Sequence, residues 1–277
     1  MGGNRKHLAM TITPNKWELD VQGYLNTCNI TAATPRKQIR DFAAGVNDLG
    51  LWNSMVCWPL RSSQNYGSGT TAFSLGGLGT FNGTLVNGPS WTADGVNFTG
   101  SSSHYISLGS SQIIGGNANY SIMGVGRLTN SAVSNIAMIS TGNNRGVAIG
   151  AANNGSTQVR VPVWRVDGVF PGAQLANGPT TSHFAAFATG DASSAKHYIN
   201  SGTAFATLSG DYRTNPSSAN VEMIGGLTTP SFAPSWNGLV SAAAFFNAKL
   251  TDEQVGTVYA LLKTSLSQSL SLPWATN

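Results

Sequence analysis

Short runs that alternate apolar and polar residues recur between residues 70 and 250, and turn-forming residues separate them. A half-buried strand alternates in this way because successive side chains point to opposite faces of the sheet. The pattern therefore predicts a mainly β sandwich of two stacked sheets. The predicted strands are 84–86, 95–98, 105–108, 120–128, 136–140, 146–151, 158–163, 183–189, 196–199, 221–224 and 239–246.

Pairs of Asn and Gly separate many of these runs. Both residue types tolerate positive φ, so the pairs predict hairpin turns. Examples are Asn82 with Gly83, Asn87 with Gly88, and the group Asn200, Ser201 and Gly202.

Helical spacing occurs at both ends of this region. Thr34 and Pro35 suit the start of a helix, and Gly50 suits its end. A second helix is expected at a capping box formed by Thr251 and Gln254. The apolar positions are Ile39, Phe42, Ala43, Val46 and Leu49 in the first helix, and Val255, Val258, Leu262 and Leu266 in the second.

The flanking segments predict an attachment region. Residues 1–33 show no clear period and are interpreted as an extended arm that docks on a neighbour or moves freely. The apolar run 51–60 must be buried against another part of the chain or against a partner. We expect residues 1–69 to form the arm, amphipathic helix and apolar segment, and 70–277 to form the sandwich with its C-terminal helix and tail.

The order of motifs resembles a concanavalin A-like, LamG-type jelly roll over most of residues 80–264. The helix followed by Gly50, Leu51 and Trp52 also resembles the leader before LamG-like domains in structural proteins of tailed bacteriophages. The closing motifs are carried by Tyr198, Asn200 and Gly202, by Ile224 and Gly225, by Gly238 and Leu239, and by Leu250, Thr251, Val255 and Tyr259.

Composition narrows the function classes. Only 9% of the 277 residues are charged, and the net charge of +4 is dilute and lies mainly in the first sixty residues, so no nucleic-acid partner is expected. No apolar run reaches the length of a membrane span or a signal peptide, which predicts synthesis in the host cytoplasm without membrane insertion. Cys28 and Cys57 lack a metal-site spacing and are expected to be inert thiols.

From its candidate catalytic residues, we expect that the chain is not an enzyme. Retaining glycoside hydrolases of this fold class place paired carboxylates on one strand as Glu-x-Asp-x-x-Glu, and this motif is absent. The glutamates are Glu18, Glu222 and Glu253. No cofactor is expected, calcium in the rim loops is left open, and His183 and His197 are expected to face each other across a hairpin.

Two groups of candidate interaction residues follow. Exposed aromatic rings can pack against the faces of sugar rings, and nearby amides can bond to the sugar hydroxyls. The same aromatic rings could instead belong to the core or to a subunit interface. Apolar residues near the termini are candidates for contact with a particle, or for a helix that closes one end of the sandwich. The glycan candidates are Trp91, Trp164, Trp236, Tyr66, Tyr212, Asn143, Asn144, Asn153 and Asn154; the particle-interface candidates are Ile39, Phe42, Val46, Trp52, Trp58 and Trp274.

The resemblance implies a non-enzymatic protein of the virion surface, either a capsid decoration protein or a tail- or fibre-associated one. Its expected partners are other virion proteins, and a homo-oligomer, with a trimer by analogy, is expected. One alternative is a lectin that binds a cell-surface glycan for host adhesion. A second alternative is a polysaccharide-degrading glycoside hydrolase, since a fold does not fix a function.

Overall fold

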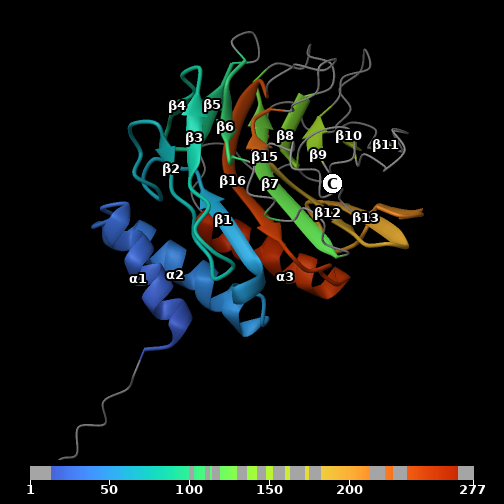
Figure 1. Ribbon diagram of the computed structural model, residues 1–277, viewed down its shortest axis with the longest axis horizontal. Helices are drawn as coiled ribbons and strands as arrows, with labels where there is room; N and C mark the ends of the chain where they lie inside the picture. Colours follow the sequence, from blue (N-terminus) through green and yellow to red (C-terminus); the bar gives the residue numbers. More distant parts are fainter. Residues whose placement is uncertain are drawn as a thin grey trace, which may run out of the picture.

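Two antiparallel sheets and a layer of helices make up the fold (Figure 1). The computed structural model describes residues 14–99, 103–109, 113, 119–129, 136–141, 148–151, 160–162, 172–174, 182–212, 222–226 and 236–267. This architecture confirms the predicted mainly β jelly-roll sandwich with helices near both ends.

The large sheet has the strand order β14-β13-β12-β7-β16-β5-β4, and β1 also pairs with β16. All of these pairs are antiparallel. The strands are β1 (Met55–Pro59), β4 (Ser90–Trp91), β5 (Val96–Phe98), β7 (Tyr120–Leu128), β12 (Phe184–Gly190), β13 (Ser194–Ile199), β14 (Ala206–Ser209) and β16 (Gly238–Phe246).

The small sheet has the order β2-β3-β6-β15-β8-β9, and β10 pairs separately with β11. Its strands are β2 (Thr71–Ala72), β3 (Gly83–Val86), β6 (Tyr105–Ser107), β8 (Ile136–Thr141), β9 (Ala148–Ala151) and β15 (Glu222–Ile224), and the separate pair is β10 (Arg160–Pro162) with β11 (Gly172–Gln174).

Strand β16 joins distant parts of the sequence. One of its edges pairs with β7 along nearly the whole strand. On the other edge, Gly238–Val240 pairs with β5 and Ala242–Phe246 pairs with β1. The predicted division at residues 69 and 70 therefore runs through a single sheet, because β1 comes from the N-terminal side of that division.

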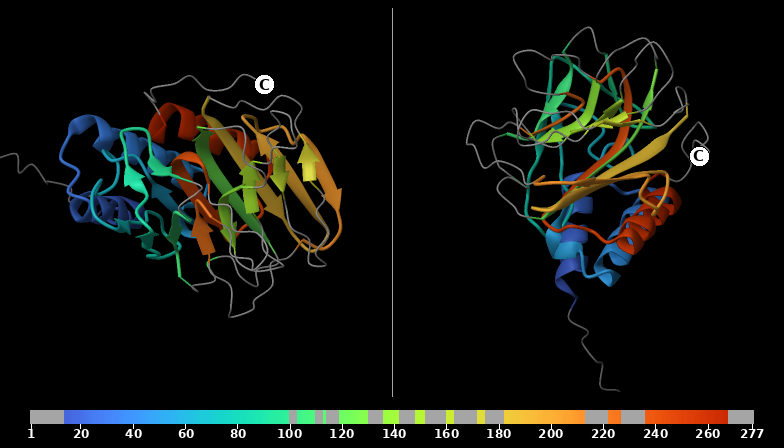
Figure 2. Two further views of the ribbon diagram at one scale, coloured as in Figure 1. Left: turned by 90° about the horizontal axis from the view of Figure 1, so that it is seen from above. Right: turned by 90° about the vertical axis from the view of Figure 1, so that its right-hand side faces the viewer.

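The central strands of the large sheet, among them β1, β12 and β16, are buried on both faces (Figure 2). Val56 and Phe245 face the small sheet, whereas Met55 and Phe246 face the helices. A sheet covered on both faces has continuous apolar strands rather than alternating ones. This explains the apolar run at 51–60, which continues from the 3-10 turn η1 (Trp52–Ser54) into β1.

Helix α1 (Lys16–Thr27) corrects the prediction of an extended arm over residues 1–33. Asn15 precedes the helix, and its backbone N–H donates to Oε2 of Glu18 over 2.7 Å. Val21 and Leu25 are buried on the inner face. Residues 1–13 of the predicted arm lie outside the described residues.

Helix α2 (Ala33–Asp48) confirms the predicted first helix and its C-terminal stop. Gly50 has a φ of 70°. Its N–H donates to the carbonyl of Asn47 over 2.8 Å, and the N–H of Leu51 donates to Val46 over 3.1 Å. These two bonds form a Schellman motif, for which a glycine in the left-handed region is favoured.

Helix α3 (Asp252–Leu261) begins at the predicted capping box and continues into the π-helical turn η3 (Leu262–Leu266). The N–H of Thr251 donates to Gln254 Oε1 over 3.0 Å, and the N–H of Gln254 donates to Thr251 Oγ1 over 3.2 Å. Asp252 accepts from Lys196 Nζ over 2.7 Å and from Tyr198 Oη over 2.8 Å. Lys196 first, and Tyr198 second, lower the pKa of Asp252. These bonds attach α3 to β13.

Three local predictions are wrong. Asn82 and Gly83 close no hairpin, because Gly83 already belongs to β3 and pairs with Ala72 of β2. Asn87 and Gly88 have the expected positive φ values, 62° and 85°, but they connect β3 of the small sheet to β4 of the large sheet instead of closing a hairpin. His197 is opposite Ala188 in the β12–β13 register and so does not face His183. His183 instead directly precedes Phe184, which pairs with Gly126 of β7.

Candidate binding site

Two predicted glycan-binding aromatics are buried. Trp236 is 0% exposed, and its indole N–H donates to the carbonyl of Leu239 over 3.2 Å. Tyr212 is 2% exposed. Neither ring has a face for a sugar, so both assignments are wrong. Trp91 is partly exposed. The remaining candidates, Trp164, Asn143, Asn144, Asn153 and Asn154, lie outside the described residues.

The predicted particle-interface residues belong to the core of the chain itself. The described ones, namely Ile39, Phe42, Val46, Trp52 and Trp58, are 0–3% exposed. Their apolar character is explained by the helix layer and by β1, which cover the large sheet and enter it. They have no surface to offer a particle. Trp274 lies outside the described residues.

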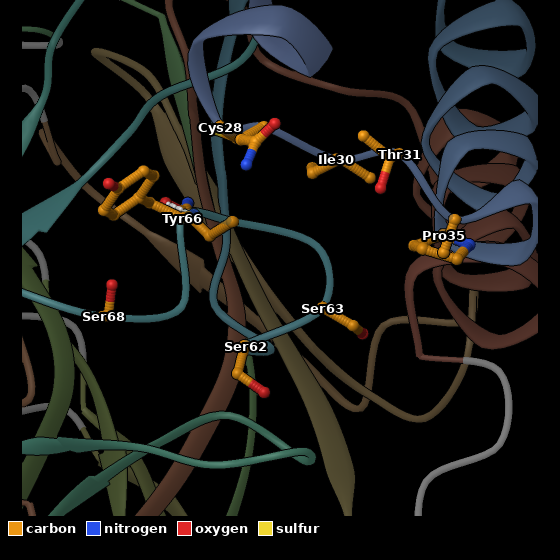
Figure 3. A pocket seen from close by; sticks show the side chains of 11 residues that line it. Cys28, Ile30, Thr31, Pro35, Ser62, Ser63, Tyr66 and Ser68 are labelled. Atoms are coloured by element: carbon orange, nitrogen blue, oxygen red, sulfur yellow. Dashed lines mark hydrogen bonds between the residues drawn. The ribbon is translucent and has the colours of Figure 1, made fainter.

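A surface pocket of about 370 Å³ lies between the connection of α1 to α2 and the segment that follows β1 (Figure 3). This volume is at the lower end of the roughly 300–1,000 Å³ typical of small-molecule sites. The lining residues are Cys28, Asn29, Ile30, Thr31, Ala32, Pro35, Ser62, Ser63, Asn65, Tyr66 and Ser68.

The lining of this pocket is polar but uncharged. Its hydroxyl and amide groups come from both walls, and no Asp, Glu, Lys, Arg or His is among the lining residues. Tyr66 is 52% exposed, and its ring meets that of Phe73 edge-on with 6.1 Å between centroids. An exposed ring beside neutral donors and acceptors suits a ligand with apolar faces and many hydroxyls.

Asn65 holds the 62–68 segment in place. It is 2% exposed, and its Oδ1 accepts from the N–H groups of Tyr66 over 2.9 Å and Phe73 over 3.1 Å. Its Nδ2 lies 2.9 Å from the carbonyls of Pro59 and Phe73 and 3.1 Å from Tyr24 Oη. One buried amide thus connects the segment to β1, to β2 through Phe73, and to α1.

Neighbouring groups extend this network to the helices. Tyr24 Oη donates to the carbonyl of Gln64 over 2.7 Å, and the Gln64 side chain donates to Gln38 on α2 over 2.8 Å. Burial raises the pKa of Tyr24 well above its usual value. Burial also raises the pKa of the Cys28 thiol to about 12, so the sulfur in the pocket wall stays protonated and unreactive at neutral pH.

The segment also packs tightly against itself and is held at its N-terminal end. Gly67 has a φ of 73°, and a Cβ there would strike the carbonyl oxygen of Ser62. The guanidinium of Arg61 donates through Nε to the carbonyl of Ala93 over 2.8 Å, and the N–H of Ser62 donates to Thr92 over 2.9 Å. The pocket wall is therefore rigid before any ligand arrives, which lowers the entropic cost of binding.

Of the pocket residues, only Tyr66 was among the sequence-based candidates. The polar residues around it were missed because isolated serines and asparagines carry no pattern. One local signal was present: a polar segment containing Tyr66, Gly67 and Gly69 directly follows Pro59, where the apolar run stops. Tyrosine in such a segment is a candidate for an exposed contact residue.

Elsewhere, the carboxylate of Glu222 has a structural role. Glu222 is 1% exposed, and its Oε2 accepts from the N–H of Ile113 over 3.0 Å. Within the described ranges, no group of three His, Cys, Asp or Glu residues could hold a metal ion. No helix in the same part of the chain is long and apolar enough to cross a membrane.

Comparison with known proteins gives a fold but no family. No family model and no curated protein matches the chain. A Trypanosoma rangeli sialidase in complex with sialic acid is similar over 84% of this chain and 39% of the enzyme, with 12% identity and a TM-score of 0.55. A mutant of that sialidase displaying trans-sialidase activity gives a TM-score of 0.53 at 10% identity, over 84% of this chain and 39% of the mutant.

A receptor binding domain is similar over 78% of this chain and 52% of its own length, with 15% identity and a TM-score of 0.49, which is too low to support an argument. The chain spans about two fifths of the length of the sialidases it matches. At these identities the likeness shows a shared β-sandwich fold, and it shows no membership of the bacteriophage LamG family.

These matches correct the expectation that the chain is not an enzyme. Enzymes that act as sialidases contain this fold over 84% of the chain. The missing Glu-x-Asp-x-x-Glu motif excludes one arrangement of catalytic carboxylates and leaves other enzymes of the same fold untouched. The inference from that motif to the absence of any enzymatic function was too broad.

Proposed function

We propose that the chain is a carbohydrate-binding β-sandwich module, and that the pocket between residues 28–35 and 62–68 takes a neutral glycan. The observation that carries the proposal is the half-exposed Tyr66 ring beside uncharged hydroxyl and amide groups in a prearranged wall. Aromatic faces pack against the C–H faces of sugars, while the polar groups bond to sugar hydroxyls.

The charge of the lining supports a neutral sugar over an acidic one. A buried carboxylate on a ligand is best held by Arg or Lys, often through two parallel hydrogen bonds. None of the lining side chains is a cation. An acidic sugar would therefore lose its hydration in this pocket without gaining a counter-charge.

For the biological setting, the virion surface of a tailed bacteriophage remains our proposal, as a capsid decoration protein or a tail- or fibre-associated protein. The support is the motif resemblance together with a composition rich in Gly and low in charge. The proposed partners are other virion proteins and further copies of this chain. Mass spectrometry of purified particles should detect the protein in stoichiometric amounts, and its absence from the particles would refute this setting.

Replacement of Tyr66 by alanine should weaken binding of a neutral glycan by about tenfold, which corresponds to 1.4 kcal/mol. The variant removes the exposed ring and keeps the buried network under it. A screen on an array of neutral and acidic glycans identifies the ligand, and titration calorimetry of wild type and variant measures the change. Leu19→Ala is the matched control, because Leu19 is 57% exposed on α1 and does not line the pocket.

Two results would contradict the proposal. One is the absence of binding to every neutral glycan on the array. The other is equal affinity in wild type and Tyr66→Ala.

A further inference from the structure

Trp91 lies at the edge of the sandwich next to the pocket. Strand β4 is the last in the order of the large sheet, and β2 is the first in that of the small sheet. Both strands lie on the left of Figure 1, above α1 and α2. The segment 62–69 leads from β1 to β2, and the N–H of Ser62 donates to the carbonyl of Thr92, the residue that follows β4.

A hydrogen bond connects Trp91 to the end of this segment. Its indole N–H donates to the carbonyl of Gly69 over 3.1 Å. Because this N–H is the only polar group of the side chain, the exposed part of Trp91 is bare aromatic surface. Its remaining surface packs against the core between the two sheets, which fixes the ring.

Trp91 and Tyr66 are therefore aromatic groups on one continuous rim. Tyr66 and Gly69 are three positions apart in the sequence, so their Cα atoms are at most about 11 Å apart. The left-handed φ values of Gly67 and Gly69, 73° and 68°, curl the segment and shorten this distance. Ser68, between Gly67 and Gly69, is exposed and lines the pocket with its hydroxyl.

We propose that the binding site extends from the pocket across Ser68 to Trp91, and that its ligand is a neutral oligosaccharide rather than a single sugar. This inference rests on the proposed function and specifies the ligand class of the same site. Tyr66 packs against the unit in the pocket, Ser68 bonds to a hydroxyl at the junction, and Trp91 packs against a unit further along the chain.

Calorimetric titration with mono- to hexasaccharides of the malto and cello series, and of any other neutral series selected by the array, tests the proposal. The affinity of the wild type should rise with the length of the oligosaccharide until the ligand is long enough to reach Trp91. Trp91→Leu should weaken the longest ligand by about fivefold and leave the monosaccharide within about twofold of wild type. Trp91→Phe should retain most of the affinity for the longest ligand, whereas Tyr66→Ala should lower the affinity for ligands of every length.

Thermal unfolding of each variant shows whether Trp91→Leu is folded at the titration temperature. If Trp91→Leu is unstable, the Phe variant and the wild-type length series still decide the question. An affinity that does not depend on length in the wild type, or an equal loss for monosaccharide and hexasaccharide in the Trp91 variants, overturns the extended site and leaves the pocket intact. Failure of the wild type to bind any neutral glycan refutes the proposed function itself.

Discussion

Replacing Asn65 by alanine should lower the free energy of unfolding by about 4 kcal/mol, at the upper end of single substitutions. The change removes a buried amide that bonds to two backbone N–H groups, two carbonyls and the hydroxyl of Tyr24. Each buried group that loses its partner costs roughly 1–3 kcal/mol. The same variant should bind glycan more weakly even where it is folded, because the wall that carries Tyr66 is no longer fixed.

Urea unfolding measures the stability effect, and Asn82→Ala provides the comparison. Asn82 is exposed and accepts from the N–H of Ser74 over 3.0 Å, so its loss should cost less than about 1 kcal/mol. Equal unfolding midpoints for the Asn65 and Asn82 variants would show that the network does not hold the segment.

Acidification from pH 6.5 to pH 4 should destabilise the protein by several kcal/mol, chiefly through two buried histidines. His183 and His197 are 0% exposed, and both nitrogens of each ring lack a hydrogen-bond partner. Burial lowers the pKa of each to about 4. For His183, the positive charge of Arg127 and then of Arg61 adds to this lowering, while Asp94 opposes it.

The direction of this change in stability with pH follows from the number of protons that the folded and unfolded chains bind. Below pH 6.5 the unfolded chain takes up protons on these histidines, whereas the folded chain takes them up only near pH 4. Stability is therefore complete above pH 6.5 and decreases as pH falls through this window, by about 3 kcal/mol for His197 at 1.36 kcal/mol per unit. The lowered pKa of Asp252 adds a further loss below about pH 5, where this carboxyl group begins to take up protons in the unfolded chain but not in the folded one.

Urea titrations at pH 7.5, 6.5, 5.5 and 4.5 would measure this dependence. His197→Leu breaks no hydrogen bond. This substitution should remove much of the pH dependence of stability, so that the variant is more stable than wild type near pH 5. The ring of His197 contacts Phe205 at 6.1 Å, which makes an apolar replacement compatible with its surroundings. An unfolding midpoint that is the same from pH 7.5 to 4.5 in the wild type would contradict the prediction.

The longest strands of the sandwich could be predicted from sequence nearly to the residue. The predicted 120–128 coincides with β7, and 239–246 lacks only the first residue of β16. Both runs are long and apolar, and turns bound them. The short strands β2 and β4, of two residues each, were missed because two residues cannot show a period. Their pairing depends on neighbours far away in the chain.

Helix α1 had a sequence signal that was overlooked. Asn15 and Glu18 have the spacing of a capping box, and Trp17, Val21 and Tyr24 recur at helical intervals. The error with Trp52 and Trp58 has a different cause. The burial of Trp58 depends on the pairing of β1 with β16, roughly two hundred residues later. The burial of Trp52 depends on packing in the core on the helix side of the sheet, and no local pattern reports either contact.

The candidate site was predictable only in its aromatic residues. Tyr66 and Trp91 could be named from sequence, but so could Trp236 and Tyr212, which are buried. What distinguishes these pairs is the path of the segment 62–69 past the sheet edge. That path is set by Asn65 and Arg61, whose bonds reach β1, β2 and the β4–β5 turn.

The position of β16 in the sheet has a consequence for synthesis on the ribosome. β1, β5 and β7 leave the exit tunnel well before the strand that pairs with all three. Until residue 246 is translated, their unpaired edges are open to neighbouring nascent chains, and edges of this kind promote aggregation. Production of this protein should therefore tolerate premature stop codons poorly, and benefit from chaperones that shield strand edges on polysomes.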